Sequence, residues 1–178
     1  IMIAVAPTIE NLSLNITEEI HVRSSLTATF AALLEEMGPS NEGANSVPMP
    51  MILEPWPGGR WFRDLGNNNG HLWGHVQAIK QPTLLEIAGP LMMSFAVASN
   101  LQYRLKEIDG GTLISLRHTA LGLFPDGYRE ALSQGWPHPL PVRCPDWSAV
   151  PPCRNGSGPA SRVPPPPVVG PIPRLGRV

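Results

Sequence analysis

Two short stretches decide the fold: residues 54–61 read EPWPGGRW and residues 70–76 read GHLWGHV. In both, turn-forming glycines and prolines stand beside alternating apolar and polar residues, which is the pattern of a half-buried strand. The run GNNNG lies between them at residues 66–70, and its glycines and asparagines favour a tight turn. The two stretches therefore predict antiparallel strands over residues 59–64 and 71–80.

Further elements are predicted on both sides of this pair. Residues 19–23 alternate as a strand, and a helix follows that Ser24 or Ser25 caps and that Gly38 and Pro39 end. Residues 1–16 are either a leader or a first strand. Four more strands are expected at 51–54, 84–88, 101–108 and 112–119, and helical spacing returns at residues 128, 132 and 136. The order of one strand, one helix, six strands and the start of a second helix predicts an α+β fold with a curved antiparallel sheet.

Four motifs in this order resemble a known superfamily. They are the glycine pair at 58–59 before a strand, G-x-V at 74–76 before Pro82, G-G-T at 110–112 with His118 at the strand end, and G-W at 135–136. Together they resemble the SRPBCC (START/Bet v-like) superfamily, in particular domains related to the C-terminal domain of the heat-shock-protein-90 ATPase activator. The resemblance implies a helix-grip fold, in which the sheet wraps around a C-terminal helix and encloses a cavity. Members bind lipids, polyketides or hormones, act as cyclases, or serve as co-chaperone modules.

The chain changes character near residue 140. Residues 139–178 hold twelve of the 22 prolines in a chain of 178 residues. We therefore predict a helix-grip domain at 17–140 and a disordered Pro/Arg-rich tail at 141–178. Because proline disrupts a helix interior, the closing helix is expected to be truncated after Trp136. The tail is either the product of a frameshift or a genuine proline-rich linker, and the nucleotide sequence in the other reading frames decides between them.

Charge and cysteine content exclude several classes of function. The formal net charge is −1, with an acidic body and arginines scattered singly through the tail, so no nucleic-acid partner is expected. Both cysteines, Cys144 and Cys153, lie in the tail, which excludes a cysteine-ligated zinc in the body. No apolar run is long enough for a membrane span, and no signal peptide is evident, so we expect a cytoplasmic protein.

Candidate ligand-contacting residues come from the aromatic and histidine positions. A cavity of this fold would be lined by large apolar side chains with a few polar groups. Those predicted to contact ligand are Phe30, Trp61, Trp73, His75, His118 and Trp136. The alternative is that these aromatic residues complete the core and that His118 makes a structural hydrogen bond. His71 and His75 are expected on one face of a strand, about 13 Å apart, which is too far to share a metal ion.

The sequence favours a domain that binds a small hydrophobic or amphipathic ligand. It contains no nucleophile motif and no glycine-rich phosphate loop before a helix, so neither catalytic residues nor a cofactor are expected. An interaction module of the co-chaperone type is the alternative. A polyketide-cyclase-like enzyme is a third reading, which needs an inward acid–base pair that the sequence does not make evident.

Overall fold

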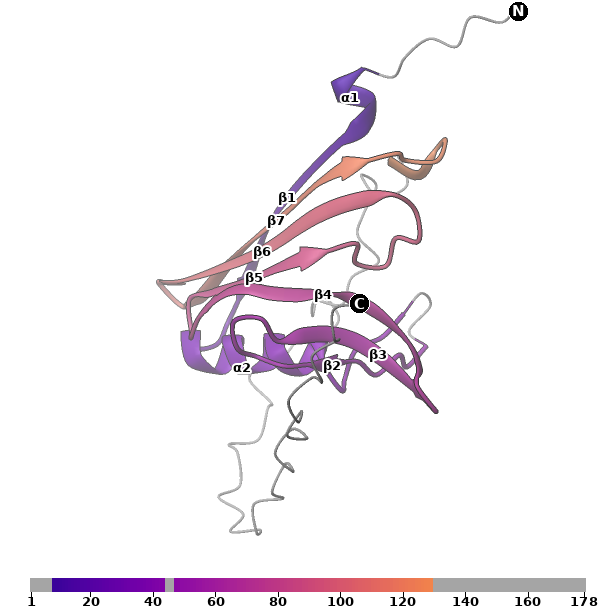
Figure 1. The fold of residues 1–178 in the computed structure, drawn as a ribbon. Helices are drawn as coiled ribbons and strands as arrows, with labels where there is room; N and C mark the ends of the chain where they lie inside the picture. The colour runs from indigo at the N-terminus through magenta and orange to yellow at the C-terminus, as the bar shows by residue number, and fades with distance from the viewer. Residues whose placement is uncertain (1–7, 44–46, 130–178) are drawn as a thin grey trace, which may run out of the picture.

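The computed structural model describes residues 8–43 and 47–129, which form a curved antiparallel sheet and two helices (Figure 1). The helices are α1 (Ile9–Leu12) and α2 (Leu26–Met37). The strands are β1 (Ser13–Val22), β2 (Ile52–Leu53), β3 (Arg60–Gly66), β4 (Asn69–Lys80), β5 (Leu84–Gly89), β6 (Val97–Ile108) and β7 (Gly111–Gly122). Their order across the sheet is β1-β7-β6-β5-β4-β3-β2, with every neighbouring pair antiparallel. The predicted α+β class and curved sheet are confirmed.

The N-terminal part differs from the prediction. β1 begins at Ser13 rather than at residue 19 and pairs with β7 along its whole length, from Ser13 opposite Leu121 to Val22 opposite Thr112. Leu14 continues the inward alternation of this strand and is buried, which explains the longer strand. The short helix α1 was not predicted. The closing helix toward Trp136 and the proline-rich tail lie outside the described residues.

Helix α2 forms where the sequence predicted it and packs on the concave side of the sheet (Figure 1). Ser25 is the N-cap, and its hydroxyl accepts a hydrogen bond from the Ala28 amide at 3.3 Å. The Gly38 amide donates to the Glu35 carbonyl at 3.1 Å and ends the helix. The buried face of α2 consists of Thr29, Phe30, Leu33 and Met37, and the helix contacts β2, β6 and β7.

Strands β3 and β4 form the hairpin that the opening motifs predicted. Its two turn residues, Asn67 and Asn68, have φ angles of 52° and 60°, the left-handed pair of a type I′ turn. The Asn69 side chain donates to the carbonyls of Gly66 and Asn67, at 3.2 Å each. The asparagine run therefore sets the register of this hairpin.

Two irregularities bend β4 across the sheet. Trp61 pairs with Gly74 while Phe62 pairs with Leu72, so Trp73 is an extra residue in β4. A second irregularity follows between residues 76 and 78, against β5. Such bulges increase the local bend and twist of a sheet. A Cβ built on Gly74 would lie 2.7 Å from the Ala88 carbonyl oxygen, so the glycine of the G-x-V motif lets β4 and β5 approach closely at the bend.

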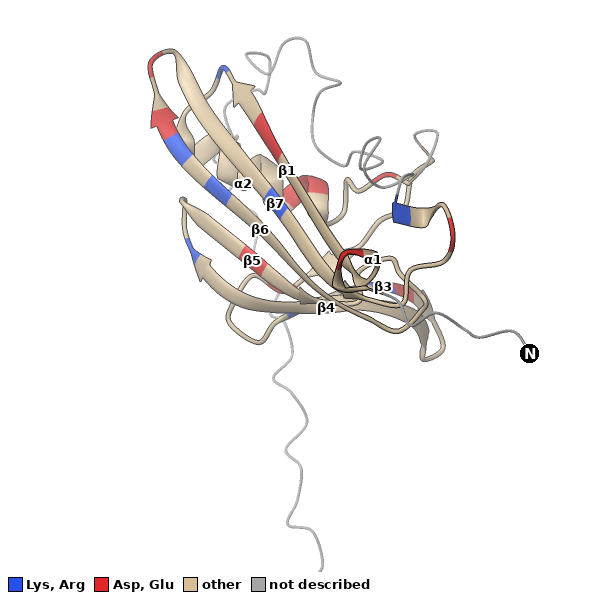
Figure 2. Cartoon of the chain, turned by 90° about the horizontal axis from the view of Figure 1, so that it is seen from above, with Lys and Arg blue, Asp and Glu red and all other residues tan. Residues whose placement is uncertain are grey.

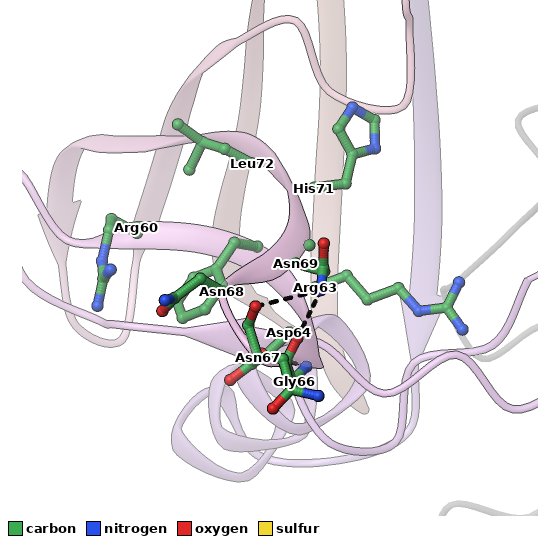
Figure 3. Close-up of a pocket in the computed structure, with 11 residues that line it drawn as sticks. Arg60, Arg63, Asp64, Gly66, Asn67, Asn68, Asn69, His71 and Leu72 are labelled. Carbon is green, nitrogen blue, oxygen red and sulfur yellow. Dashed lines mark hydrogen bonds between the residues drawn. The ribbon is translucent and has the colours of Figure 1, made fainter.

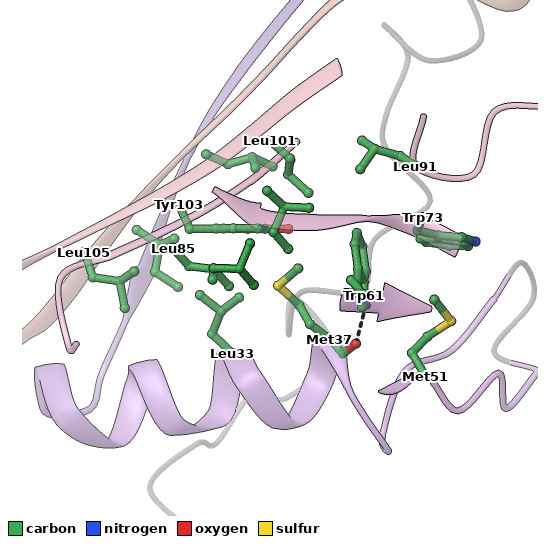
Figure 4. Close-up of a cluster of buried hydrophobic side chains, with 14 of the residues drawn as sticks. Leu33, Met37, Met51, Trp61, Trp73, Leu85, Leu91, Leu101, Tyr103 and Leu105 are labelled. Carbon is green, nitrogen blue, oxygen red and sulfur yellow. Dashed lines mark hydrogen bonds between the residues drawn. The ribbon is translucent and has the colours of Figure 1, made fainter. Parts of the chain in front are cut away.

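The hydrophobic core fills the layer between the concave face and α2 (Figure 4). Leu33 and Met37 of α2 face buried side chains of the central strands, among them Leu85 and Leu101. Within residues 8–43 and 47–129, no helix has the length and apolar character needed to cross a membrane.

Candidate functional site

The concave face of β1, β7 and β6 is the candidate site. Alternate residues of these strands point toward the α2 side, and their register aligns them in rows across the sheet. Most are apolar, which gives the face the character of a lipophilic surface: Leu14, Ile16, Ile20, Val22, Ile114, Leu116, Ala120, Leu101 and Leu105. In Figure 1, α2 lies across one end of the sheet, while β1 and β7 extend well past it.

Four buried polar side chains interrupt this apolar face: Ser99 and Tyr103 of β6, and Thr112 and His118 of β7. Tyr103 of β6 and His118 of β7 are both fully buried. The Tyr103 hydroxyl has no hydrogen-bond partner among the described residues. Burial raises the pKa of the Tyr103 hydroxyl far above its ordinary value, and the negative charge of Glu18 raises it further. Burial lowers the pKa of the His118 imidazole to about 4. Both side chains are therefore neutral at pH 7.

Glu18 brings a carboxylate to the same face. It is half-buried on β1 and pairs with Leu116, which in turn pairs with Tyr103 on β6. Strands lie about 4.8 Å apart, so the Glu18 and Tyr103 backbones are about 10 Å apart. His118 is two residues beyond Leu116 on the same face of β7, which makes it a diagonal neighbour of both. The sequence showed no evident His–carboxylate pair, but the register places a carboxylate diagonally beside this histidine.

Four of the six predicted ligand-contacting residues are buried on this side of the sheet: Phe30, Trp61, Trp73 and His118. The rings of Trp61 and Trp73 meet edge to face, with centroids 4.9 Å apart. The Trp61 indole also donates to the Met37 carbonyl at 2.7 Å and so ties the end of α2 to β3. These contacts give the two tryptophans a packing role.

His75, which was predicted to contact ligand, lies apart from this group on the outer face of the sheet. It pairs with Arg60, is exposed, and precedes the buried Val76. His71 and His75 were expected on one face of a strand, but they lie on opposite faces of β4. The extra residue at Trp73 shifts the alternation, so that His71 lies on the Trp73 side and accepts a hydrogen bond from the Trp73 indole at 3.1 Å. Trp136 lies outside the described residues.

Four charged strand residues, Arg60, Glu86, Arg104 and Arg117, lie on the outer face and not among the inward residues that would orient a ligand. Glu86 accepts hydrogen bonds from Asn100 at 2.7 Å and Gln102 at 3.0 Å, in a polar ladder on the convex side. Arg104 joins it through Gln102, and Arg117 pairs with Gln102 across the sheet. Arg60 forms an ion pair with Glu54, which lowers the pKa of that carboxyl group. All four belong to the outer face.

A hollow of about 700 Å³ lies around the β3–β4 hairpin and is lined by residues from both of its faces. Figure 3 shows Arg60 and Leu72 on one side of this hairpin and Arg63 and His71 on the other. In Figure 2 the Lys and Arg residues are mixed with Asp and Glu residues. They form no continuous basic surface in that view.

Glu18 and Tyr103 were missed by the sequence reasoning, although a signal for each exists. Leu14, Ile16, Ile20 and Val22 alternate as inward apolar residues, and Glu18 is the interruption of that series. Tyr103 follows Leu101 and precedes Leu105 at the same spacing on β6. In each strand, the sign of a candidate site residue is a charged or hydroxyl-bearing side chain at a position where the alternation predicts an inward apolar one.

Known structures share this architecture at low sequence identity. An uncharacterised protein from Rhizobium leguminosarum is 15% identical with a TM-score of 0.50, and the match covers 68% of this chain and 87% of that one. Ara h 8.0201 is 14% identical with a TM-score of 0.52, covering 68% and 89% of the two chains. An AHSA1-like protein from Aeromonas hydrophila is 16% identical with a TM-score of 0.49, covering 68% and 85%. No family model and no curated protein matches the sequence.

The described residues share the α+β fold of Ara h 8.0201, with a curved antiparallel sheet. This is the curved antiparallel sheet that the resemblance of the sequence motifs implied. At these identities the likeness establishes a common fold, whereas function depends on the individual site.

The role of Trp61 as a tie between α2 and the sheet can be measured. Trp61→Phe removes the buried indole N–H and leaves the Met37 carbonyl without that donor, so we expect the free energy of unfolding to fall by about 1–3 kcal/mol in urea denaturation. Trp73→Phe is the matched control, because its indole bonds to the exposed His71 instead. Equal losses in the two variants would contradict this role.

Proposed function

We propose that this domain binds a small hydrophobic or amphipathic molecule on its concave face, on the α2 side of the sheet. The observation that carries the proposal is the character of that face. It is a broad apolar surface with a buried tyrosine hydroxyl that no described residue satisfies. Small-molecule sites are mostly apolar with a few well-placed polar groups, and this face has that composition. The shared fold with Ara h 8.0201 is consistent with the proposal.

A second candidate is a protein-interaction surface on the outer face. Ile52, Phe62 and Leu72 form one row across β2, β3 and β4, because Ile52 pairs with Phe62 and Phe62 with Leu72. Ile52 and Leu72 are each 43% exposed, and the Arg60 guanidinium lies 4.6 Å from the centre of the Phe62 ring. Contiguous exposed apolar side chains of this kind are typical of interaction surfaces.

A matched pair of variants separates the two candidates. Ile16 is half-buried on the concave face, whereas Leu72 belongs to the outer row, so Ile16→Ser and Leu72→Ser remove apolar surface from one face each. Nile red, a neutral apolar dye, is titrated into each full-length protein. We expect saturable binding to the unaltered protein, a several-fold loss of affinity in Ile16→Ser, and no change in Leu72→Ser. Loss in Leu72→Ser alone would favour the outer row, and no saturable binding to any of them would contradict the proposal.

A further inference from the structure

β1 is the longer of the two strands that end the sheet. It spans Ser13–Val22 at one end of the order β1-β7-β6-β5-β4-β3-β2 and forms one margin of the sheet in Figure 2. β7 pairs with one of its edges, and no backbone hydrogen bond joins the other edge to residues 8–43 or 47–129. The amide and carbonyl groups along an open strand edge can pair with a strand of another chain. This free edge of β1 is therefore a candidate interaction surface.

The free edge of β1 has little protection against such pairing. Proteins usually block an edge with a short strand, a proline, a lysine, a bulge or an inward charge. Residues 13–22 contain no proline or lysine, and their register against β7 is unbroken, so the inward Glu18 is the one device of this kind. β2, at the opposite end of the sheet, is only Ile52–Leu53, and the Met51 amide beside it donates to the Gly38 carbonyl at 2.9 Å. Of the two end strands, β1 is the one open to a partner strand.

The sequence of β1 is compatible with self-pairing in one register. A two-fold axis perpendicular to the sheet pairs β1 antiparallel with the same strand of a second copy and keeps the inward residues on one face. With the axis at Thr17, residues 13–21 of the two copies overlap and Glu18 faces Ile16 of the second copy. An axis at Ile16 shortens the overlap to residues 13–19. An axis at Glu18 places two carboxylates directly opposite each other, which is unfavourable.

The side chains on both faces match in the register centred on Thr17. On the outer face, Asn15 lies opposite Glu19, so the amide of one copy can donate a hydrogen bond to the carboxylate of the other. Thr17 meets Thr17 at the axis, a cross-strand pair that stabilises sheets. On the concave face, Leu14 lies opposite Ile20 and continues the apolar surface across the axis. This self-complementarity favours a second copy of the chain as the partner.

We propose that the free edge of β1 is a dimerisation edge, which pairs antiparallel with β1 of a second copy with Thr17 on the two-fold axis. The dimer joins two curved sheets into one continuous sheet, and the inward residues of both copies lie on the same side of it. The two Glu18 side chains become diagonal neighbours across the axis, so the dimer is expected to be reversible. The inference is independent of the proposed binding of a small molecule.

Thr17 is exposed, so a charge placed there meets the same charge of the second copy. Thr17→Lys and Thr17→Glu are compared with the unaltered full-length protein by sedimentation velocity over a series of concentrations. We expect the unaltered protein to show a monomer–dimer equilibrium. Each variant alone should dimerise several-fold more weakly, because like charges face each other. An equimolar mixture of the two variants should recover dimerisation, because an ammonium and a carboxylate group then face each other.

Gln77→Lys is the matched control, because it adds the same charge at an exposed position of β4, away from the free edge of β1. It should dimerise like the unaltered protein. A monomer at every concentration of the unaltered protein would overturn the inference and leave the edge to a different extended segment. A dimer that both Thr17 variants leave unchanged would place the interface elsewhere, and weak dimerisation that the mixture does not restore would contradict the register. Recovery in the mixture shows in addition that both variants are folded.

Discussion

Gly89→Ala is expected to destabilise the domain by about 3 kcal/mol, a large share of the stability of a typical domain. A Cβ at this position would lie 2.4 Å from the Trp73 carbonyl oxygen and 2.5 Å from the Gly74 Cα. Both contacts are with backbone atoms of β4, so no side chain can move to relieve them. β5 would have to separate from β4 where the bulge bends the sheet, and urea denaturation of the variant measures the cost.

Gly66→Ala is the matched control for this prediction. Gly66 has a φ of 77°, and a Cβ there would meet nothing within 4 Å. This substitution therefore carries only the conformational cost of a left-handed residue, about 1–2 kcal/mol. If Gly89→Ala were no more destabilising than Gly66→Ala, the close approach of β4 and β5 would not be what this glycine is needed for.

Stability is expected to fall as the pH is lowered from about 6.5 to about 4, with His118 responsible for a large part of the loss. Burial lowers the folded-state pKa of His118 from 6.5 to about 4. In that window the unfolded chain binds a proton at this residue and the folded chain does not, so acidification favours unfolding. A shift of this size corresponds to about 3 kcal/mol, complete once the pH is below both pKa values.

A comparison with His118→Gln isolates this contribution. Urea denaturation at a series of pH values from 7 to 4 should show that the unaltered protein loses about 3 kcal/mol more than the variant over this range. Carboxyl groups that titrate in the same range affect both proteins and cancel in the difference. His75→Gln is the second control, because it removes an exposed histidine instead of a buried one. Parallel profiles for the unaltered protein and His118→Gln would show that His118 is not buried as a neutral group.

The sequence predicted the strands because their side chains alternate and because their turns contain distinctive residues. The asparagines at 67 and 68 and the glycines at 110 and 111 lie at positive φ, where the predicted turns require them. Helix α2 was predicted to within two residues at its start, because Ser25 caps it and Gly38 ends it. These features depend on local chemistry, which a single sequence shows.

The parts that could not be predicted depend on pairing between distant residues. The bulge at Trp73 arises from the register of β3 against β4, and it moved His75 to the exposed side. Glu18, Tyr103 and His118 are far apart in sequence and become neighbours only through the order β1-β7-β6. The inward position of each could be inferred from alternation, but their proximity could not.

The central claim is that small apolar molecules bind the concave face, and methyl NMR during a titration with 2-naphthol tests it most directly. Assigned isoleucine and leucine methyl groups report on both faces of the sheet. The account predicts saturable shift changes at Ile16, Leu101 and Leu116, with Ile52 and Leu72 on the outer row unaffected. Changes confined to Ile52 and Leu72, or none at the concave-face methyl groups at saturating probe, would contradict it.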